Sequence, residues 1–345
     1  MVKMKNFVYE KPINVYYEIT IACDLNCKHC RAEAIPERSK EELKLEEIKE
    51  VLRDIKGMGS NLIISGGDPL KREDIFEILD YAKEINLPVA VTPTTSPLAT
   101  FEKIKKMKEK GIFSIAVSID GDRESHDNFR GVNGTFENSI NVLNYAKELN
   151  IPVQVNTIFT KGRVLDVKKV YDILYKNFSP PVKRWSIFFL VPTGRGSNLF
   201  LPSYNEILEI FEFLYEKSKS SPFYIGTTEA PFYRVFYLLK ENKNFDDISN
   251  LKMGFGVRDG NGVVFISHKG DIYPSGFLPL KTGNVKKEKL SEVYKNNEIM
   301  KKLRDVKFLK GKCGKCIYKN ICGGARARAY ALKGDYLEED PICIF

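Results

Sequence analysis

Three cysteines near the start of the chain are spaced for metal chemistry: Cys23, Cys27 and Cys30 stand in the pattern C-x3-C-x2-C. They follow an apolar run at 13–21 that is typical of a buried strand. Three thiolates on one short loop can bind three corners of a cubic iron–sulfur cluster and leave its fourth iron open for a small molecule. A structural zinc site with a distant fourth ligand is the alternative, but zinc ligands usually come as two C-x2-C pairs.

A second group of cysteines lies near the end of the chain, at Cys313, Cys316, Cys322 and Cys343. Four thiolates are enough to saturate one 4Fe-4S cluster, and a four-cysteine zinc site is the alternative here. The chain has seven cysteines, so the two groups account for all of them. We therefore expect two metal centres, the first with an open position and the second without one.

The composition is that of an ordinary soluble globular protein, with 43% hydrophobic and 29% charged residues. A chain of 345 residues can bury a large core and hold a second, smaller domain. No apolar run approaches the ~20 residues that span a bilayer, and residues 1–10 lack the apolar core of a signal peptide. We therefore expect a cytoplasmic protein with no membrane partner, whose cysteines bind metal and form no disulfides.

The net charge of +9 suits an anionic partner, either nucleic acid or a small molecule with carboxylates or phosphates. The lysines are spread along helix faces such as 103–110, and no arginine–aromatic stretch recurs. The charge alone does not decide between the two, but this distribution argues against nucleic acid. We expect an anionic small molecule.

Strand-like and helix-like segments alternate from 13 to 215. Apolar runs predict six buried parallel strands, at 14–20, 62–65, 89–92, 112–119, 153–159 and 185–191. Amphipathic helices lie between them, and Ser39 with Glu42 and Ser203 with Glu206 form capping-box patterns before two of these helices. Six βα units in a row predict a parallel α/β fold, either an open sheet or a complete or partial (β/α) barrel.

The rest of the chain has a different pattern. Residues 219–250 are irregular and predict a connection between domains, with a short helix around 233–239. Two short strands around a turn, at 262–267 and 272–274, predict a β-hairpin, which a helix and the cysteine-rich end follow. We therefore expect a barrel domain at 1–218, a connecting segment at 219–255 and a small α+β domain of hairpin and helices at 256–345.

Polar and glycine-bearing runs follow several predicted strands, where a parallel barrel presents its functional groups. These runs are Ser65-Gly66-Gly67-Asp68-Pro69, Ser118-Ile119-Asp120-Gly121, Asn156-Thr157 and Thr193-Gly194-Arg195-Gly196. Each is weak alone, because a turn, a helix cap or a salt bridge of Asp127 with Arg130 explains such residues as well. Their significance comes from the cysteine loop that precedes them.

In its cysteine spacing and in the strand before it, the chain resembles the radical S-adenosylmethionine (SAM) superfamily. Gly66, Gly67, Asp68 and Pro69 resemble that family's Gly-Gly-Glu-Pro motif, with Asp68 in place of the usual Glu. The resemblance implies a partial barrel of six βα units, an iron–sulfur cluster on Cys23, Cys27 and Cys30, and reductive cleavage of SAM to a 5′-deoxyadenosyl radical. That radical takes a hydrogen atom from the substrate, and a low-potential donor such as a ferredoxin supplies the electron.

The same resemblance implies which residues bind SAM. The backbone of Gly66 and Gly67 holds the methionine ammonium, and Ser118 and Asp120 lie beside SAM. Asn156 is expected to contact the ribose or methionine part of SAM, and Gly194 is expected to lie on its adenine side. No catalytic side chain is predicted beyond the cysteine loop.

The cysteine-rich end resembles the SPASM/twitch extensions of radical SAM enzymes, notably in Cys322-Gly323-Gly324 and in Gly283-Asn284-Val285. It departs from full SPASM domains at Pro274-Ser275-Gly276, where those carry a further cysteine. The resemblance therefore implies one auxiliary 4Fe-4S cluster, which relays an electron or anchors the substrate.

Within the superfamily, the stretches after Cys322 and at 334–341 resemble the cofactor-maturation branch. That branch implies an anionic cofactor precursor as substrate, with a tungsten–pterin cofactor first, a haem precursor second and a ribosomally made peptide third. Arg326 and Arg328 either meet this anion or pair with an acid among Glu338, Glu339 and Asp340. A non-enzymatic zinc- or iron–sulfur-binding module is the alternative of another class, and it leaves the glycine and Ser-Ile-Asp motifs without a reason.

Overall fold

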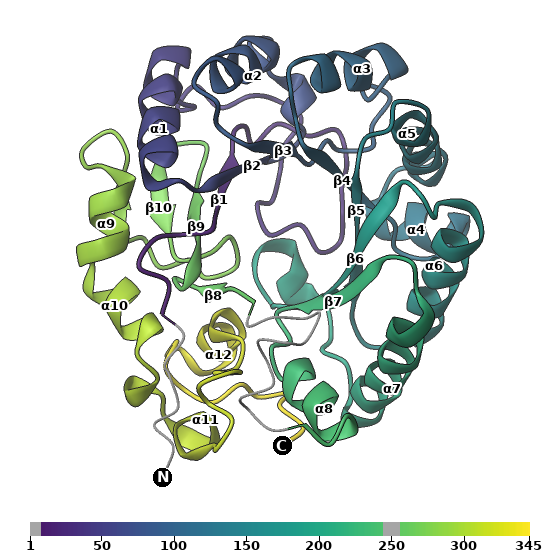
Figure 1. The fold of residues 1–345 in the computed structure, drawn as a ribbon, viewed down its shortest axis with the longest axis vertical. Helices are drawn as coiled ribbons and strands as arrows, with labels where there is room; N and C mark the ends of the chain where they lie inside the picture. Colours follow the sequence, from purple (N-terminus) through teal and green to yellow (C-terminus); the bar gives the residue numbers. More distant parts are fainter. Residues whose placement is uncertain (1–7, 244–255) are drawn as a thin grey trace.

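A curved parallel sheet with helices around its outer side forms the frame of the molecule (Figure 1). The structure is a computed structural model, and it describes residues 8–243 and 256–345. Seven strands pair in parallel in chain order: β1 (Asn14–Glu18), β2 (Asn61–Ser65), β3 (Val89–Val91), β4 (Ser114–Ser118), β5 (Val153–Phe159), β6 (Val182–Phe189) and β7 (Tyr224–Thr228). The predicted α/β fold with a partial barrel is confirmed.

The helices pack on the sheet through one apolar stripe each. They are α1 (Leu45–Met58), α2 (Ile75–Glu84), α3 (Phe101–Glu109), α4 (Arg123–Arg130), α5 (Thr135–Glu148), α6 (Val164–Asn177), α7 (Tyr204–Ser220) and α8 (Tyr233–Lys240). Helix α1, for example, buries Ile48, Leu52 and Ile55 completely. None of the helices that the structure describes is both long and apolar enough to cross a bilayer.

One predicted capping box is confirmed and the other is wrong. Ser203 and Glu206 cap α7 reciprocally, as their spacing predicts. Helix α1 begins later than expected, at Leu45, and there the Glu47 carboxylate accepts from the Lys44 N–H at 2.7 Å. The carboxylate of Glu42 is buried instead and binds the segment before the cysteine loop.

A seventh strand lies where the sequence predicts an irregular connection. Strand β7 pairs with β6 in parallel, and the short helix expected around 233–239 is present as α8. The sequence of β7 carries little apolar signal, since only Ile225 and Gly226 are buried in it, and its strand form depends on pairing with β6. Residues 244–250 of the predicted connection lie outside the described residues.

The predicted hairpin is confirmed, and it extends the barrel sheet. Strand β9 (Gly262–Ile266) pairs in parallel with β1 and antiparallel with β10 (Asp271–Tyr273). Val264 and Ile266 of β9 share one hydrophobic cluster with Val15 and Tyr17 of β1. The C-terminal part therefore packs on the barrel through a common core, and the domain boundaries at 218/219 and 255/256 remain predictions.

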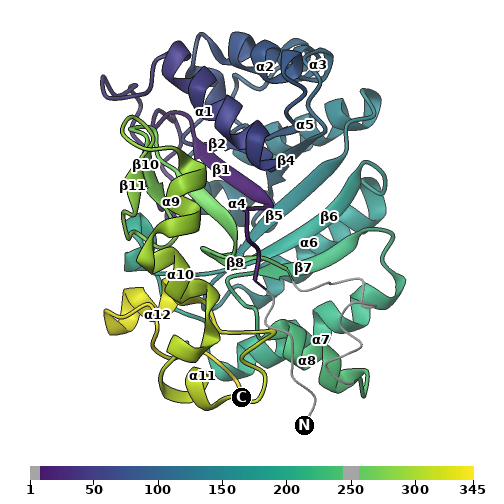
Figure 2. The ribbon, with the colours of Figure 1, turned by 60° about the vertical axis from the view of Figure 1, so that its left-hand side comes forward.

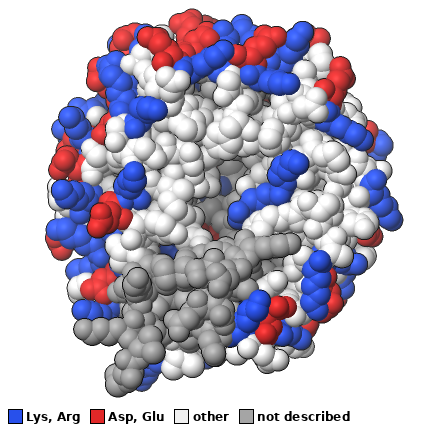
Figure 3. Space-filling model, in the orientation of Figure 1, with Lys and Arg blue, Asp and Glu red and all other residues white. Residues whose placement is uncertain are grey.

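The remaining C-terminal elements are short and lie together on one side of the barrel (Figure 2). They are β8 (Arg258–Asp259), β11 (Gly283–Asn284), α9 (Leu290–Asn296), α10 (Glu298–Arg304), α11 (Gly311–Lys315) and α12 (Arg326–Lys333). On the face shown in Figure 3, acidic and basic side chains are intermixed along the outer rim, whereas mostly uncharged residues surround a hollowed centre. The intermixed rim agrees with the spread of lysines seen in the sequence.

Candidate functional site

A cavity of about 230 Å³ lies at the carboxyl ends of the parallel strands, and Cys23, Cys27 and Cys30 line it. The other predicted site residues that line this cavity are Gly66, Gly67, Ser118, Asp120 and Asn156. Because the strands are parallel, their ends meet at one side of the barrel. The fold thus brings together residues that are more than a hundred positions apart in the sequence.

The cysteine loop is held from behind by the segment after β6. Arg195 donates from its backbone N–H to the Cys30 carbonyl at 3.0 Å and from Nε to the Cys27 carbonyl at 2.9 Å. Gly194 packs so closely that a Cβ there would lie 2.6 Å from the Cys30 carbonyl oxygen, and its φ is +53°. Gly194 therefore supports the loop from outside the cavity lining, whereas the sequence resemblance places it on the adenine side.

The glycine pair after β2 lies directly against the start of the cysteine loop. Gly67 donates its N–H to the Thr20 carbonyl at 2.8 Å, and Gly66 has a φ of +148°. A Cβ at Gly66 would lie 2.5 Å from the Thr20 carbonyl oxygen, and one at Gly67 would overlap the Ala22 carbonyl. Only glycine lets the two backbone segments approach this closely.

Asp68 and Pro69 lie behind the glycine pair and do not line the cavity. The Asp68 carboxylate is completely buried and accepts from Leu70 N at 3.1 Å and from Ser96 Oγ at 2.7 Å. Burial raises the pKa of Asp68, and these hydrogen bonds oppose that rise. Pro69 begins a short 3-10 helix. Both residues hold the turn in place.

Asp120 is a buried carboxylate that fixes an arginine beside the cysteine loop. Its Oδ2 accepts from Arg130 Nε at 2.7 Å, and Arg130 Nη1 lies 3.9 Å from Cys27 Sγ. Burial alone would raise the pKa of Asp120, but the Arg130 guanidinium, together with the neighbouring histidines and the hydrogen bond from Ile158 N, holds that pKa well below its usual range. The pairing of Asp127 with Arg130 is wrong, because Asp127 caps α5 through Gly134 N and Phe136 N instead.

His126 was not singled out by the sequence, although it packs under Asp120. Its ring is completely buried, and Nδ1 accepts from Asp120 N at 3.0 Å. Burial, together with the charge of Arg130, lowers the pKa of His126 from 6.5 to about 4. Between these two pH values the unfolded chain binds a proton that the folded chain does not, so stability falls as the pH falls.

We therefore expect His126→Asn, whose amide oxygen can still accept from Asp120 N, to make the free energy of unfolding depend less on pH below pH 7. Between pH 7 and pH 5 the free energy of unfolding of the wild type should fall by about 2 kcal/mol more than that of the variant. Urea titrations at the two pH values measure this difference. An equal fall in both proteins contradicts a neutral, buried His126.

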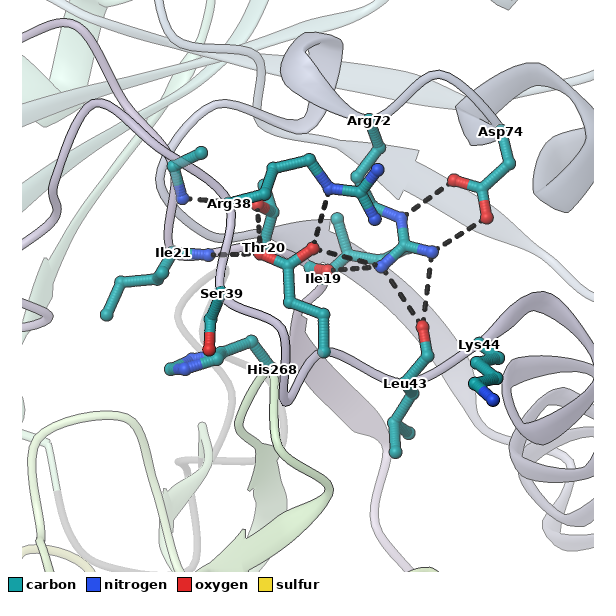
Figure 4. Close-up of polar contacts among 12 residues, drawn as sticks. Ile19, Thr20, Ile21, Arg38, Ser39, Leu43, Lys44, Arg72, Asp74 and His268 are labelled. Atoms are coloured by element: carbon teal, nitrogen blue, oxygen red, sulfur yellow. Dashed lines mark hydrogen bonds and ion pairs between the residues drawn. The ribbon is translucent and has the colours of Figure 1, made fainter.

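A buried ion-pair cluster supports the chain just before the cysteines (Figure 4). The Glu42 carboxylate accepts from Thr20 Oγ1 at 2.5 Å, from Ile21 N at 3.2 Å and from Arg38 Nε at 2.9 Å. Arg72, almost fully buried, lies 3.5 Å from Glu42 and pairs with Asp74 at 2.7 Å. In Figure 4, Arg38 and Arg72 point toward this centre from separate segments.

Glu42→Gln should destabilise the fold by about 3 kcal/mol, because it leaves the buried Arg72 with less counter-charge. The neighbouring Glu41 is exposed and forms a surface ion pair with Lys269, so Glu41→Gln should change stability by less than about 0.5 kcal/mol. Denaturant midpoints of the two variants give the comparison. Similar values for both would mean that the cluster contributes little.

The four C-terminal cysteines line a second, smaller cavity of about 30 Å³, together with Gly323, Gly324 and Asp340. All seven cysteines of the protein are free thiols. In the part of the chain that the structure describes, no group of three or more metal-ligating side chains is arranged to hold a single metal ion. The case for the two sites therefore rests on the convergence of the cysteines on two cavities.

The two arginines after Cys322 behave differently. Arg328 forms a fully buried, two-pronged ion pair with Asp340, with Nε–Oδ1 at 2.8 Å and Nη2–Oδ2 at 2.7 Å. It also donates to the carbonyl of Leu190, which lines the first cavity, at 3.1 Å. Of the two alternatives for Arg328, pairing with an acid is confirmed. Arg326 has no ion pair among the described residues and donates to backbone carbonyls and to Cys313 Sγ.

The sequence places Arg195 in a glycine-bearing run after the sixth predicted strand without a role for its side chain, and it does not mark Arg31; both line the first cavity. Arg195 binds carbonyls about 160 positions away, and no local pattern marks such a contact. Arg31 directly follows Cys30, and its guanidinium lies 2.9 Å from Glu18 and 4.2 Å above the ring of Phe265. Proximity to the cysteines was the one available signal for Arg31.

Comparison with known proteins agrees with this geometry. Residues 17–174 match the sequence model described as the Radical SAM superfamily. The chain is 38% identical over 341 residues to an AdoMet-dependent heme synthase of Methanosarcina barkeri, which covers 97% of both chains. It is 31% identical over 356 residues to an Fe-coproporphyrin III synthase of the same organism, over 97% of this chain and 88% of that one.

Solved structures show the same fold at lower sequence identity. Streptococcus suis SuiB bound to S-adenosylmethionine superposes with a TM-score of 0.77 at 17% identity, over 99% of this chain and 79% of that one. Native anSMEcpe with bound AdoMet superposes with a TM-score of 0.72 at 17% identity, over 96% of this chain and 94% of that one. Both extend across the barrel and the C-terminal part.

Proposed function

The chain belongs to the radical SAM superfamily, and from that premise we propose that it modifies a haem precursor. The observation that carries this proposal is the 38% identity with an AdoMet-dependent heme synthase over 97% of both chains. The resemblance of the C-terminal stretches favours a tungsten–pterin cofactor over a haem precursor. The relatives reverse that order, because one is named a heme synthase and another is named after an iron porphyrin, Fe-coproporphyrin III.

The residues that line the first cavity fit the cofactors of the family. Three free thiols, Cys23, Cys27 and Cys30, would hold three irons of a 4Fe-4S cluster and leave one iron for SAM. The backbone at Gly66 and Gly67 and the side chains of Ser118 and Asn156 would hold SAM. When bound, the cluster and SAM supply a 5′-deoxyadenosyl radical that takes a hydrogen atom from the substrate.

The protein's own part in this chemistry is charge, position and exclusion of water. Burial raises the pKa of Cys27, and the neighbouring Arg130 cation opposes that rise and favours the thiolate that binds iron. Asp120 keeps Arg130 in place, and Arg195 holds the loop from behind. Residues from the segments after β4 and β6 thus support the cysteine loop from outside it.

The walls of the cavity suit a flat, carboxylate-bearing ring. Phe188 and Phe277 line it with their ring centroids 6.3 Å apart and offer an apolar face. Arg31 lines the same cavity with a side chain that is 21% exposed, and its guanidinium, which pairs with Glu18 at 2.9 Å, keeps further N–H donors for a carboxylate. An iron porphyrin with peripheral carboxylates has both an apolar face and anionic arms, so it matches these groups better than a uniformly polar substrate does.

We assign a second, auxiliary 4Fe-4S cluster to the four C-terminal cysteines. We also propose that a low-potential donor such as a ferredoxin is the source of electrons. The four thiols converge on one cavity that is too small for a substrate. The electron donor has no contact surface assigned to it.

Anaerobic protein with dithionite, SAM and an iron porphyrin that carries propionate side chains should yield a porphyrin that has lost carboxyl groups. We expect one molecule of 5′-deoxyadenosine for each carboxyl group lost, because one hydrogen atom is taken from each propionate. The side chain then loses CO2 and one electron and becomes a vinyl group, and the auxiliary cluster, in its oxidised form, would accept that electron. Mass spectrometry of both products measures the ratio. The same assay with a metal-free porphyrin is the matched control. Modification of a pterin or a peptide, with no change in the porphyrin, would contradict the proposal.

A further inference from the structure

Two buried arginines of helix α12 differ in what balances their charge. Arg328 has a carboxylate partner, Asp340, at 2.7 Å. Arg326 is 2% exposed and has no ion-pair partner in the residues that the structure describes. Its hydrogen bonds run to the carbonyls of Gly324, Tyr336 and Glu338, and its Nη2 donates to Cys313 Sγ at 3.5 Å.

A buried guanidinium without a carboxylate is costly unless another anion balances it. Asp259 is a buried acid close to Arg326, but burial raises its pKa and favours its neutral form. Asp335 also feels the charge of Arg326, but its carboxylate pairs with Lys310. The group of possible negative charge that Arg326 contacts directly is the thiol of Cys313. A thiolate at Cys313 gives that balance, and an anionic cluster on four thiolates gives more of it.

A second arginine approaches the same cysteines from strand β8. Arg258 lies near Cys322 and donates to the Lys319 carbonyl at 3.5 Å. Arg234, Arg326 and Cys322 are among the groups that interact electrostatically with Arg258. Several cations therefore crowd around one thiol group, which is unfavourable until a strong negative charge is present there.

The two glycines after Cys322 make this approach possible. Gly323 and Gly324 have φ angles of +69° and +68°, which favour glycine. A Cβ at Gly323 would lie 2.5 Å from Arg258 Nη1, and a Cβ at Gly324 would overlap Arg326 Nη2 and lie 3.0 Å from Cys313 Sγ. The motif thus leaves room for two guanidinium groups beside the thiols.

We propose that Arg326 and Arg258 raise the electron affinity of the auxiliary cluster by placing two cations against its thiolate ligands. This inference rests on the auxiliary cluster assigned in the proposed function. Adding one electron makes the cluster more negative by one charge, and a nearby cation stabilises that reduced form more than the oxidised form. Net charge and hydrogen bonds to sulfur are among the factors that set cluster potentials. The two arginines are positioning and tuning residues, and they touch no substrate.

The test is a redox titration with dithionite, followed by electron paramagnetic resonance, on the full chain with both clusters assembled. The Cys27→Ala protein identifies the auxiliary signal. Arg326→Gln removes the charge, and Arg326→Lys keeps it. Arg304→Gln is the matched control, because Arg304 is also buried in the C-terminal part and binds backbone carbonyls, but among the described residues it has no hydrogen bond to a cysteine, whereas Arg326 does.

We expect Arg326→Gln to lower the midpoint potential of the auxiliary cluster by at least about 59 mV, which corresponds to a tenfold change in the one-electron reduction equilibrium. Arg326→Lys should retain most of the wild-type potential, and Arg304→Gln should not change it. Arg258 is partly exposed, so Arg258→Gln gives an independent second test with the same expected direction if Arg326→Gln fails to fold.

Unchanged potentials in both glutamine variants, with a full auxiliary cluster, overturn the inference and leave the proposed function intact. An auxiliary site that holds zinc also overturns it, while the SAM-binding cluster can still be assayed separately. Loss of SAM cleavage and of porphyrin modification in the wild type is the different result that would count against the proposed function.

Discussion

Replacing Cys27 with alanine is expected to reduce formation of 5′-deoxyadenosine from SAM to background. Cys27 is one of three thiols that line the first cavity, and two thiols cannot hold a three-ligand cluster firmly. The iron content of anaerobically prepared protein should fall from roughly eight to roughly four per chain. Chromatography of the nucleoside and a colorimetric iron assay measure the two effects.

The matched control for Cys27→Ala is Cys343→Ala, which removes a thiol from the second cavity instead. It should lose the other half of the iron and still cleave SAM. Equal loss of SAM cleavage in both variants would mean that the two groups of cysteines do not form separate sites.

Gly67→Ala should weaken SAM binding by roughly a hundredfold, because small displacements at a reacting site have effects of that size. The new Cβ would overlap the Ala22 carbonyl, so the glycine turn must move away from the cysteine loop. The KM for SAM and the binding of SAM to reduced and oxidised protein measure the change. The cluster should still assemble, since the three thiols are unchanged.

Gly57→Ala is the control for this substitution. Gly57 lies in helix α1, and nothing lies within 4 Å of a Cβ placed there. Alanine at Gly57 should stabilise the helix by up to about 1 kcal/mol and leave SAM binding unchanged. A Gly67→Ala protein with wild-type affinity for SAM would show that the turn does not contact SAM.

The sequence predicts the frame of the fold well, because buried parallel strands and amphipathic helices each leave a strong local pattern. The hairpin at β9 and β10 and the capping box at Ser203 and Glu206 are of this kind. Strand β7 leaves no such pattern, and its form depends on pairing with β6. Glu42 resembles a helix cap in sequence, yet its carboxylate is buried in an ion-pair cluster that no local rule describes.

The site follows the same division. Short motifs predict the cysteines and the glycine turn, since their chemistry depends on spacing along the chain. The placing of Gly194 behind the loop, the pairing of Arg130 with Asp120, and the contrast of Arg326 with Arg328 depend on contacts between distant segments. Spacing alone leaves such contacts open, as it did for the two arginines.

The substrate was the least predictable part, because the motifs that mark SAM chemistry are shared by enzymes with different substrates. The resemblance of the C-terminal stretches predicts a tungsten–pterin cofactor as the first candidate substrate. Similarity to a heme synthase carries more weight, since it covers 97% of the chain and is not limited to the short C-terminal stretches.

The most direct test of the account is transfer of a hydrogen label from substrate to SAM. An iron porphyrin deuterated in its propionate side chains is incubated anaerobically with the protein, dithionite and SAM. The mass of the 5′-deoxyadenosine formed is then measured by mass spectrometry. The account predicts one deuterium in each nucleoside formed, and none with Cys27→Ala. Unlabelled 5′-deoxyadenosine from a protein that binds the porphyrin would contradict it.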